Sequence, residues 1–182
     1  MKKIILLVLI FFAISVSSQS LVNNTIDISG GYAPDGFGVN ATFNVILDDN
    51  YVKLGLYVSS NKYKYTSMVD VDYEIPYTIL SVNGGYFIPF IKNRQESLIL
   101  SGGLGVLAGY EVVNGGSNEL ENGAIIENKS AFIYGGFGTL EFEVALNHRM
   151  FILTKVTEYY HVNSDLGNAT MYAGLGLRFY IN

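Results

Sequence analysis

The sequence predicts an all-β fold: an antiparallel up-and-down transmembrane β-barrel of about eight strands, of the outer-membrane type. Residues 132–146 alternate without a break, so that Glu141 and Glu143 share one face of a strand and apolar side chains share the other. This run is about three times the usual strand length of ~5–6 residues. Beyond the N-terminus, no apolar run reaches the ~20 residues that a helical span needs. A long strand with one apolar and one polar face suits a barrel with lipid outside and a wet interior.

Eight segments alternate in this way and are predicted to be strands. The weakest is the seventh, because its first residues, Met150 to Leu153, place apolar side chains on both faces. No face is assigned within the first segment. In chain order the segments are 24–32, 37–47, 51–60, 77–88, 97–112, 131–146, 149–161 and 169–181.

From the second segment onward, apolar residues recur at nearly every second position, and most of the residues between them are small or polar. The small or polar face is predicted to line the lumen, and the apolar face to contact lipid. In chain order, the polar members of the lumen face include Asn40, Thr42, Asn44, Lys53, Ser59, Ser81, Asn83, Ser101, Thr139, Glu141, Glu143, Lys155, Thr157 and Arg178.

The connections between the segments alternate in length. Three are short and polar, at 47–50, 89–96 and 146–149, whereas 60–76, 113–130 and 162–168 are mostly longer and 33–36 is a short exception. Outer-membrane barrels have short periplasmic turns and longer outer loops. This order therefore places the N-terminus at the periplasmic side, and an even strand count returns the C-terminus there.

Five charged residues on the predicted lumen face are expected to form one ion-pair network. An eight-stranded barrel has an interior that side chains just fill, and buried charges must be paired and hydrogen-bonded. We therefore predict a filled lumen rather than an open channel, too narrow to pass DNA. The members of the predicted network are Lys53, Glu141, Glu143, Lys155 and Arg178.

The N-terminus has the pattern of a secretory signal. Lys2 and Lys3 precede an 11-residue apolar run, Ile4 to Ile14, and Val16-Ser17-Ser18 supplies small residues for cleavage. Residues 1–18 are therefore predicted to be a signal peptide and 19–182 a single barrel domain, exported to the outer membrane of a Gram-negative bacterium. An uncleaved anchor is the alternative, although the run is short for a span.

Composition narrows the class of function. The chain has no cysteine, and its net charge of −5 argues against a nucleic-acid surface, which needs clustered Lys and Arg. Aromatics make up 14% of the residues, and those near strand ends are expected to form belts at the two membrane interfaces. These are Tyr32, Tyr51, Tyr77, Phe90, Tyr110, Phe132, Phe151, Tyr159, Tyr160 and Tyr180.

Catalytic and cofactor motifs are weak, and we expect neither a cofactor nor a bound metal. Gly103-x-Gly105-x-x-Ala108 resembles a dinucleotide fingerprint, but that motif needs a following helix, and strand alternation runs straight through it. The chain is therefore not expected to bind a nucleotide.

His161 raises two further alternatives. It lies near Ser164 and Asp165, but a catalytic triad needs three groups that converge with defined geometry, and a shared polar loop does not supply it. Glu158, His161 and Asp165 also offer metal-ligand chemistry. Because exposed strand ends often carry such residues, we do not expect a metal site there. With neither alternative favoured, we expect the protein not to be an enzyme.

The connection 113–130 is the most distinctive loop. It carries several carboxylates and an apolar patch, Ala124-Ile125-Ile126. Long loops in compact folds are functional or disordered, and exposed apolar residues mark contact sites. A lid folded over the barrel is the alternative. The residues predicted to contact a partner are Asn118, Glu119, Leu120, Asn122, Gly123, Ile125 and Ile126.

Several stretches from about residue 73 onward resemble the TraO-type conjugal transfer protein of Bacteroidetes conjugative transposons. The resemblance implies an envelope component of a conjugative transfer apparatus, with no enzymatic activity and no catalytic residue to carry over. The long loop and the segment 158–167 are the specific parts. The matching stretches are YEIPY (73–77), LSVNGGYF (80–87), GGLGVLAGYEVVNGG (102–116), NELENGAII (118–126), KSAFIYGGFG (129–138) and EYYHVNSDLG (158–167).

These observations favour an outer-membrane barrel that serves conjugative transfer by docking other machinery proteins through its surface loops. Its expected partners are outer-membrane lipid and other conjugative-transfer proteins, without direct binding of nucleic acid; the oligomeric state is left open. The alternatives are a general surface barrel, such as an adhesin or envelope-stability protein, and a lipid- or peptide-modifying barrel enzyme. A soluble periplasmic ligand-binding barrel is the structural rival, and it would turn its apolar face inward.

Overall fold

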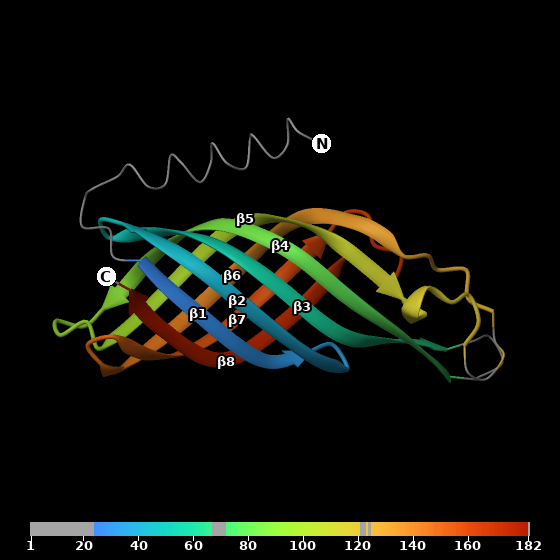
Figure 1. The fold of residues 1–182 in the computed structure, drawn as a ribbon, viewed down its shortest axis with the longest axis horizontal. Coiled ribbons are helices and arrows are strands. Elements are labelled where there is room, and N and C mark those ends of the chain that lie inside the picture. Colours follow the sequence, from blue (N-terminus) through green and yellow to red (C-terminus); the bar gives the residue numbers. More distant parts are fainter. Residues whose placement is uncertain (1–23, 67–71, 121–122, 124, 182) are drawn as a thin grey trace, which may run out of the picture.

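The computed structural model describes residues 24–66, 72–120, 123 and 125–181. In them eight antiparallel strands form one closed barrel in the order β1 to β8, with β8 paired to β1 (Figure 1). The predicted fold is therefore confirmed, whereas the predicted signal peptide, 1–18, lies outside the described residues. The strands are β1 (Asn24–Ala33), β2 (Gly36–Leu47), β3 (Asn50–Thr66), β4 (Asp72–Lys92), β5 (Leu98–Val113), β6 (Ala131–Asn147), β7 (Met150–His161) and β8 (Ala169–Ile181).

Most strand ends lie within one or two residues of the prediction, but β3 and β4 are longer. They pair from Tyr51 with Phe87 out to Thr66 with Asp72. The outer part of this hairpin carries charge on its outer side, where Lys62 donates to Glu74 at 2.7 Å. Alternation between apolar and polar residues fades there, so the pattern contained no sign that the strands continue.

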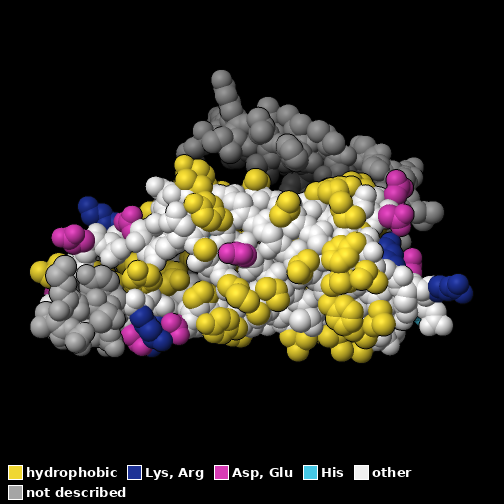
Figure 2. All heavy atoms as spheres, turned by 180° about the vertical axis from the view of Figure 1, so that it is seen from behind, with side chains coloured by type: hydrophobic (Ala, Val, Ile, Leu, Met, Phe, Trp, Pro, Cys, Tyr) yellow, Lys and Arg dark blue, Asp and Glu magenta, His cyan; other side chains and the backbone are white. Residues whose placement is uncertain are grey.

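The barrel wall is apolar outside and polar inside. Outward side chains such as Leu104 and Leu175 are 75% and 63% exposed, and Figure 2 shows apolar side chains spread over the outer surface. Inward positions hold the buried polar and charged groups. This is the reverse of a soluble barrel, and so large an exposed apolar surface is typical of a barrel that spans a membrane.

Inward side chains fill the lumen in two parts. One part is a group of six charged residues, called the charged network below: Asp27, Lys53, Glu141, Glu143, Lys155 and Arg178, each at most 3% exposed. The other part is a row of six rings in successive contact, called the aromatic row: Tyr172, Tyr57, Tyr159, Phe137, Phe87 and Tyr51.

The aromatic row corrects the predicted interface belts. Tyr51, Tyr77, Phe151 and Tyr159 are buried, because each has an odd number on a strand whose odd positions point inward. Tyr32, Phe90, Tyr110, Phe132 and Tyr160 are about half exposed on the outer wall, as a belt requires. Proximity to a strand end thus does not by itself predict an interface residue, since the parity of the position also matters.

The two ends of the barrel differ. The first and last strand ends lie at the same end as the three short turns, and the longer connections lie at the other (Figure 1). Below we call these the turn end and the loop end. Within the described part of the chain, no helix is long and apolar enough to cross a membrane.

Candidate functional site

Arg178 is the centre of the charged network. Its Nε and Nη2 donate to the two carboxylate oxygens of Asp27 at 2.6 and 2.7 Å. Nη1 donates to Oε1 of Glu143 at 2.5 Å, and Nη2 also reaches Oε2 of Glu141 at 2.8 Å. One guanidinium on β8 therefore joins carboxylates from β1 and β6, and its contact with Asp27 has the two-pronged geometry that makes arginine pairs strong.

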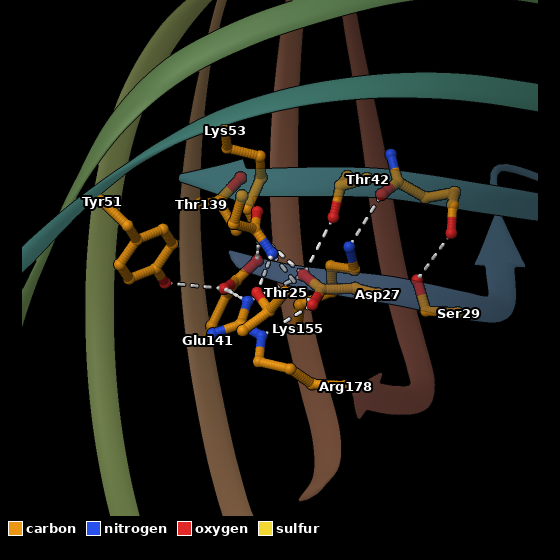
Figure 3. A network of polar contacts seen from close by, with 12 residues as sticks. Thr25, Asp27, Ser29, Thr42, Tyr51, Lys53, Thr139, Glu141, Lys155 and Arg178 are labelled. Atoms are coloured by element: carbon orange, nitrogen blue, oxygen red, sulfur yellow. Dashed lines mark hydrogen bonds and ion pairs between the residues drawn. The ribbon is translucent and has the colours of Figure 1, made fainter. Parts of the chain in front are cut away.

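Lys53 supplies the second cation of the network. Its ammonium group donates to Oε1 of Glu141 and lies 3.4 Å from Oδ2 of Asp27. Tyr51, two residues earlier on β3, donates to Oε2 of Glu141 at 2.9 Å. Glu141 therefore accepts from Lys53, Tyr51 and Arg178, and Figure 3 shows these side chains converging in the lumen.

Asp27 belongs to the network, although the sequence analysis did not single it out. Besides its two cations, it accepts from Thr42 at 2.8 Å and from Asn44 at 3.0 Å, both on the neighbouring strand β2. A signal was available in the sequence. Asp27 stands between Ile26 and Ile28, which places it on the polar face of an alternating segment.

Lys155 lies in the lumen but pairs differently from the other two cations. It stands opposite Glu141 in the β6–β7 register, yet its ammonium donates to the amide oxygen of Asn40 at 2.7 Å. Among the described residues, no carboxylate lies within ion-pair distance of it. The five residues predicted for the lumen therefore all point inward, but four of them and Asp27 form the ion pairs.

The charged network closes the lumen electrostatically as well as sterically. It contains three carboxylates and three cations, so its formal charges cancel. Buried charges are stable only when they are paired and hydrogen-bonded, and Thr42, Asn44 and Tyr51 satisfy further lone pairs. At the turn end, Glu143 and Arg178 line a pocket of about 180 Å³.

The loop between β5 and β6 folds back on itself. After a short 3-10 turn at Asn114–Gly116, an isolated bridge pairs Glu119 with Ile125, and Ile126 donates its backbone N–H to Asn118 at 2.9 Å. Asn114 secures the base of the loop, because its side-chain amide donates to the carbonyl of Glu119 at 2.8 Å.

This fold-back corrects part of the predicted contact surface. Leu120 and Ile126 are buried and pack with the lumen side chains, whereas Ile125 is 82% exposed. The bridge explains the difference, since neighbouring residues of an extended pair point to opposite sides. The exposed members of the predicted set are Asn118, Glu119, Gly123 and Ile125, and Asn122 lies outside the described residues.

His161 is buried at the loop end of β7 without the partners that a triad needs. Neither of its ring nitrogens has a hydrogen-bond partner among the described residues. Ser164 instead donates to Oε2 of Glu111 at 2.8 Å, and Asp165 accepts from the backbone N–H of Lys129 at 3.4 Å. Ser164 and Asp165 are thus hydrogen-bonded to other residues, and His161 has no partner among the described residues, so the three groups do not form a triad.

The three residues of the metal alternative do not converge either. Glu158 is exposed on the outer wall, whereas His161 is fully buried in the lumen. Three positions apart on one strand, they point to opposite faces. Among the described residues, no group of three potential ligands lies close enough to hold a metal ion.

The solved structures to which this one is similar are outer-membrane barrels. This similarity and the filled, polar lumen together define the class of protein: a small barrel of the outer-membrane type. A major outer membrane protein from Thermus thermophilus has a TM-score of 0.65 at 9% identity, covering 89% of this chain and 100% of that one. OprG from Pseudomonas aeruginosa has a TM-score of 0.55 at 14% identity, covering 86% and 96%. Ail of Yersinia pestis, solved with the heparin analogue sucrose octasulfate, has a TM-score of 0.51 at 14% identity, covering 88% and 97%.

The family follows from the sequence match. The family of the conjugative transposon protein TraO matches residues 18–181, nearly the whole chain, and the chain belongs to it. The resemblance found in the loop 113–130 and in the segment 158–167 is therefore confirmed. No curated protein matches the chain.

Proposed function

We propose that the protein serves a conjugative transfer apparatus as an outer-membrane barrel that docks or stabilises other proteins of the machinery through its surface loops. Membership of the TraO family supports the link to conjugation, and the apolar outer wall supports the location in the outer membrane. In this role the barrel is an anchor that holds its loops at a defined place on the cell surface.

The observation that carries the proposal is the filled lumen. Arg178, Glu141 and Asp27 join across its interior, and the aromatic row occupies the space beside them. A barrel of eight strands is wide enough only for its own side chains. DNA does not fit through such a lumen, so a contribution to transfer has to come from the outer surfaces.

The β5–β6 loop is the surface best suited to contact a partner. Leu120 and Ile126 anchor it in the mouth of the barrel, and Ile125 projects outward beside Glu119. An exposed apolar side chain on an ordered support costs little entropy to bind, because less of the loop has to be immobilised on contact. The described residues of the loop thus resemble a preformed contact site more than a free connection.

Deletion of the gene from the donor tests the link to conjugation. We expect transfer frequency to fall while growth stays unchanged, and expression of the intact chain in trans to restore transfer. Normal transfer frequency from a clean, non-polar deletion would refute the proposal.

The docking role of the loop has its own test. Ile125→Ser removes the exposed apolar side chain without touching the lumen, so we expect lower transfer and weaker recovery of transfer proteins in pull-downs, with an intact barrel. Gln95→Ser, exposed in a turn at the other end, is the matched control. Recovery of host ligands alone, equal for both variants, would instead favour the general surface barrel.

A further inference from the structure

Glu158 is a carboxylate placed on the apolar outer wall. It lies on β7 between two outward residues, Val156 and Tyr160, which are 42% and 53% exposed. Across the sheet its neighbours are Gly138 on β6 and Met171 on β8. None of these four neighbours has a charged side chain, so nothing beside Glu158 on the wall can neutralise its charge.

Three other charged side chains on the outer side of the described strands have partners near the strand ends. Lys62 pairs with Glu74, Lys64 with Asp35 and Lys92 with Asp49. Glu158 makes no ion pair or hydrogen bond with any described residue. Figure 2 shows an isolated acidic side chain among apolar ones on the outer surface. An ionisable group facing lipid is costly and marks a functional contact.

A hollow of about 920 Å³ lies beside Glu158 on the same wall. Outward-facing glycines of β5 and β6 form its floor, and Leu104 and Leu140 stand at its sides. The residues that line the hollow include Gly102, Leu104, Gly136, Gly138, Leu140 and Glu158. The wall is therefore recessed where its unpaired charge lies.

The barrel's own packing does not require glycine at position 138 of this floor. A Cβ at Gly103, which points inward, would overlap the ring of Phe87, so that glycine is sterically needed. A Cβ at Gly138 would come no closer than 3.4 Å to its neighbours, whereas one at Gly136 would lie 3.3 Å from the backbone oxygen of Gly105, which is a tight contact. Glycine within a strand costs about 0.5–1 kcal/mol relative to alanine. Gly138 thus keeps the wall low at a cost to stability.

We propose that this hollow is a docking site, within the membrane, for an apolar segment of another protein that carries a lysine or arginine against Glu158. Small residues let backbones approach closely in membranes, where packing and polar contacts drive association. The carboxylate selects a cation, because the pair would neutralise a charge that lipid cannot. A second copy of this chain does not fit, since the described outer wall offers only Lys62, Lys64 and Lys92, near the strand ends.

Site-specific photocrosslinking in donor cells tests this docking site. A photoreactive amino acid replaces Leu104, which is 75% exposed at the hollow, or Leu54 on β3, which is 60% exposed on another part of the wall. We expect a protein adduct from position 104 and none from position 54. The crosslinked peptide should come from an apolar membrane segment with a lysine or arginine. Glu158→Lys alone, or replacement of that lysine or arginine by glutamate alone, should abolish the adduct, and the two changes together should restore it.

Two further variants separate the charge from the shape. Glu158→Gln should reduce the adduct by removing the ion pair, and Gly138→Leu should abolish it by filling the hollow. Heat-modifiable gel migration checks that both barrels are folded. Adducts with lipid alone, adducts with a second copy, or equal adducts at positions 104 and 54 would each overturn the proposal. The result does not depend on conjugation, since normal transfer in a deletion strain would refute the proposed function and leave the adduct in place.

Discussion

The two parts of the lumen fill the same barrel by different physics. In the charged network, single side chains hold several strands: Arg178 alone contacts Asp27, Glu141 and Glu143. In the aromatic row, rings touch in sequence, as where Tyr57 stacks on Tyr159 with centroids 4.6 Å apart. The network depends on the direction and pairing of its charges, whereas the row depends on volume and on contact.

This difference teaches where the barrel should be sensitive to small chemical changes. Removing one partner of a buried ion pair leaves a charge that nothing neutralises. Removing a polar atom from a packed ring leaves the stacking in place. We therefore expect substitutions that keep side-chain volume to be severe in the charged network and mild in the aromatic row.

Arg178→Met gives the largest expected effect and is the strongest attempt to break the comparison. It keeps most of the side-chain length but leaves three carboxylates short of a cation, and loss of one partner from a buried pair costs about 3–5 kcal/mol. We expect a much lower urea midpoint of unfolding in lipid vesicles, or failure to reach the heat-modifiable form.

Arg178→Lys is the control for that variant. It restores one charge without the two-pronged contact to Asp27, so its stability should fall between those of the wild type and Arg178→Met. Equal stability of Arg178→Met and the wild type would show that the network does not hold the strands together.

Tyr51→Phe should have an intermediate effect, because Tyr51 joins the two parts. Its ring stacks on Phe87 at 5.1 Å, and its hydroxyl donates to Glu141 at 2.9 Å. The substitution keeps the ring and removes a hydrogen bond to a charged group, which is worth about 1.5–3 kcal/mol. Equilibrium unfolding in urea measures the loss, and an unchanged midpoint would mean that the hydroxyl contributes nothing to Glu141.

Tyr57→Phe should have the smallest effect and gives the sharpest contrast with Tyr51→Phe. The hydroxyl of Tyr57 is buried and has no hydrogen-bond partner among the described residues, while its ring contacts Tyr159 and Tyr172. We expect a change within about 0.5 kcal/mol of zero, or a slight gain, because a buried unsatisfied group is removed. A loss as large as that of Tyr51→Phe would contradict the distinction between the two parts.

The alternating pattern predicted most of the barrel because lipid and lumen impose a period of two on every strand. That period placed Lys53, Glu141 and Arg178 on the inner face without any tertiary information. It offered no guide beyond residue 60 of β3, where the outer side of the hairpin carries charge in place of apolar side chains. It would have placed Asp27 as well, had the first segment been assigned a face.

The pairing inside the lumen was beyond reach, because it depends on how strands far apart in the ring are staggered. Lys155 stands opposite Glu141 in the ladder and yet meets Asn40 across the lumen. The buried side of the loop at Leu120 and Ile126 depends on a fold-back that composition does not reveal. Glu158 is a different case. Its outward position follows from the alternation of Val156, Glu158 and Tyr160, so the sequence pattern alone places a charge on the apolar wall.

The seam between β1 and β8 has a consequence for the order in which the barrel assembles. Asp27 and Arg178 are 151 positions apart in the chain, so their contact forms only when β8 pairs with β1. Until β8 arrives, Asp27 lacks its two-pronged partner, and the sheet has two open edges. Pairing of β8 with β1 therefore closes the sheet and supplies the cation Arg178 in the same step. A chain that stops before residue 178 would have an open barrel and an Asp27 without its arginine partner. Its open sheet edges and the carboxylate that lacks this partner would distinguish such a chain from the closed barrel for a quality-control protease.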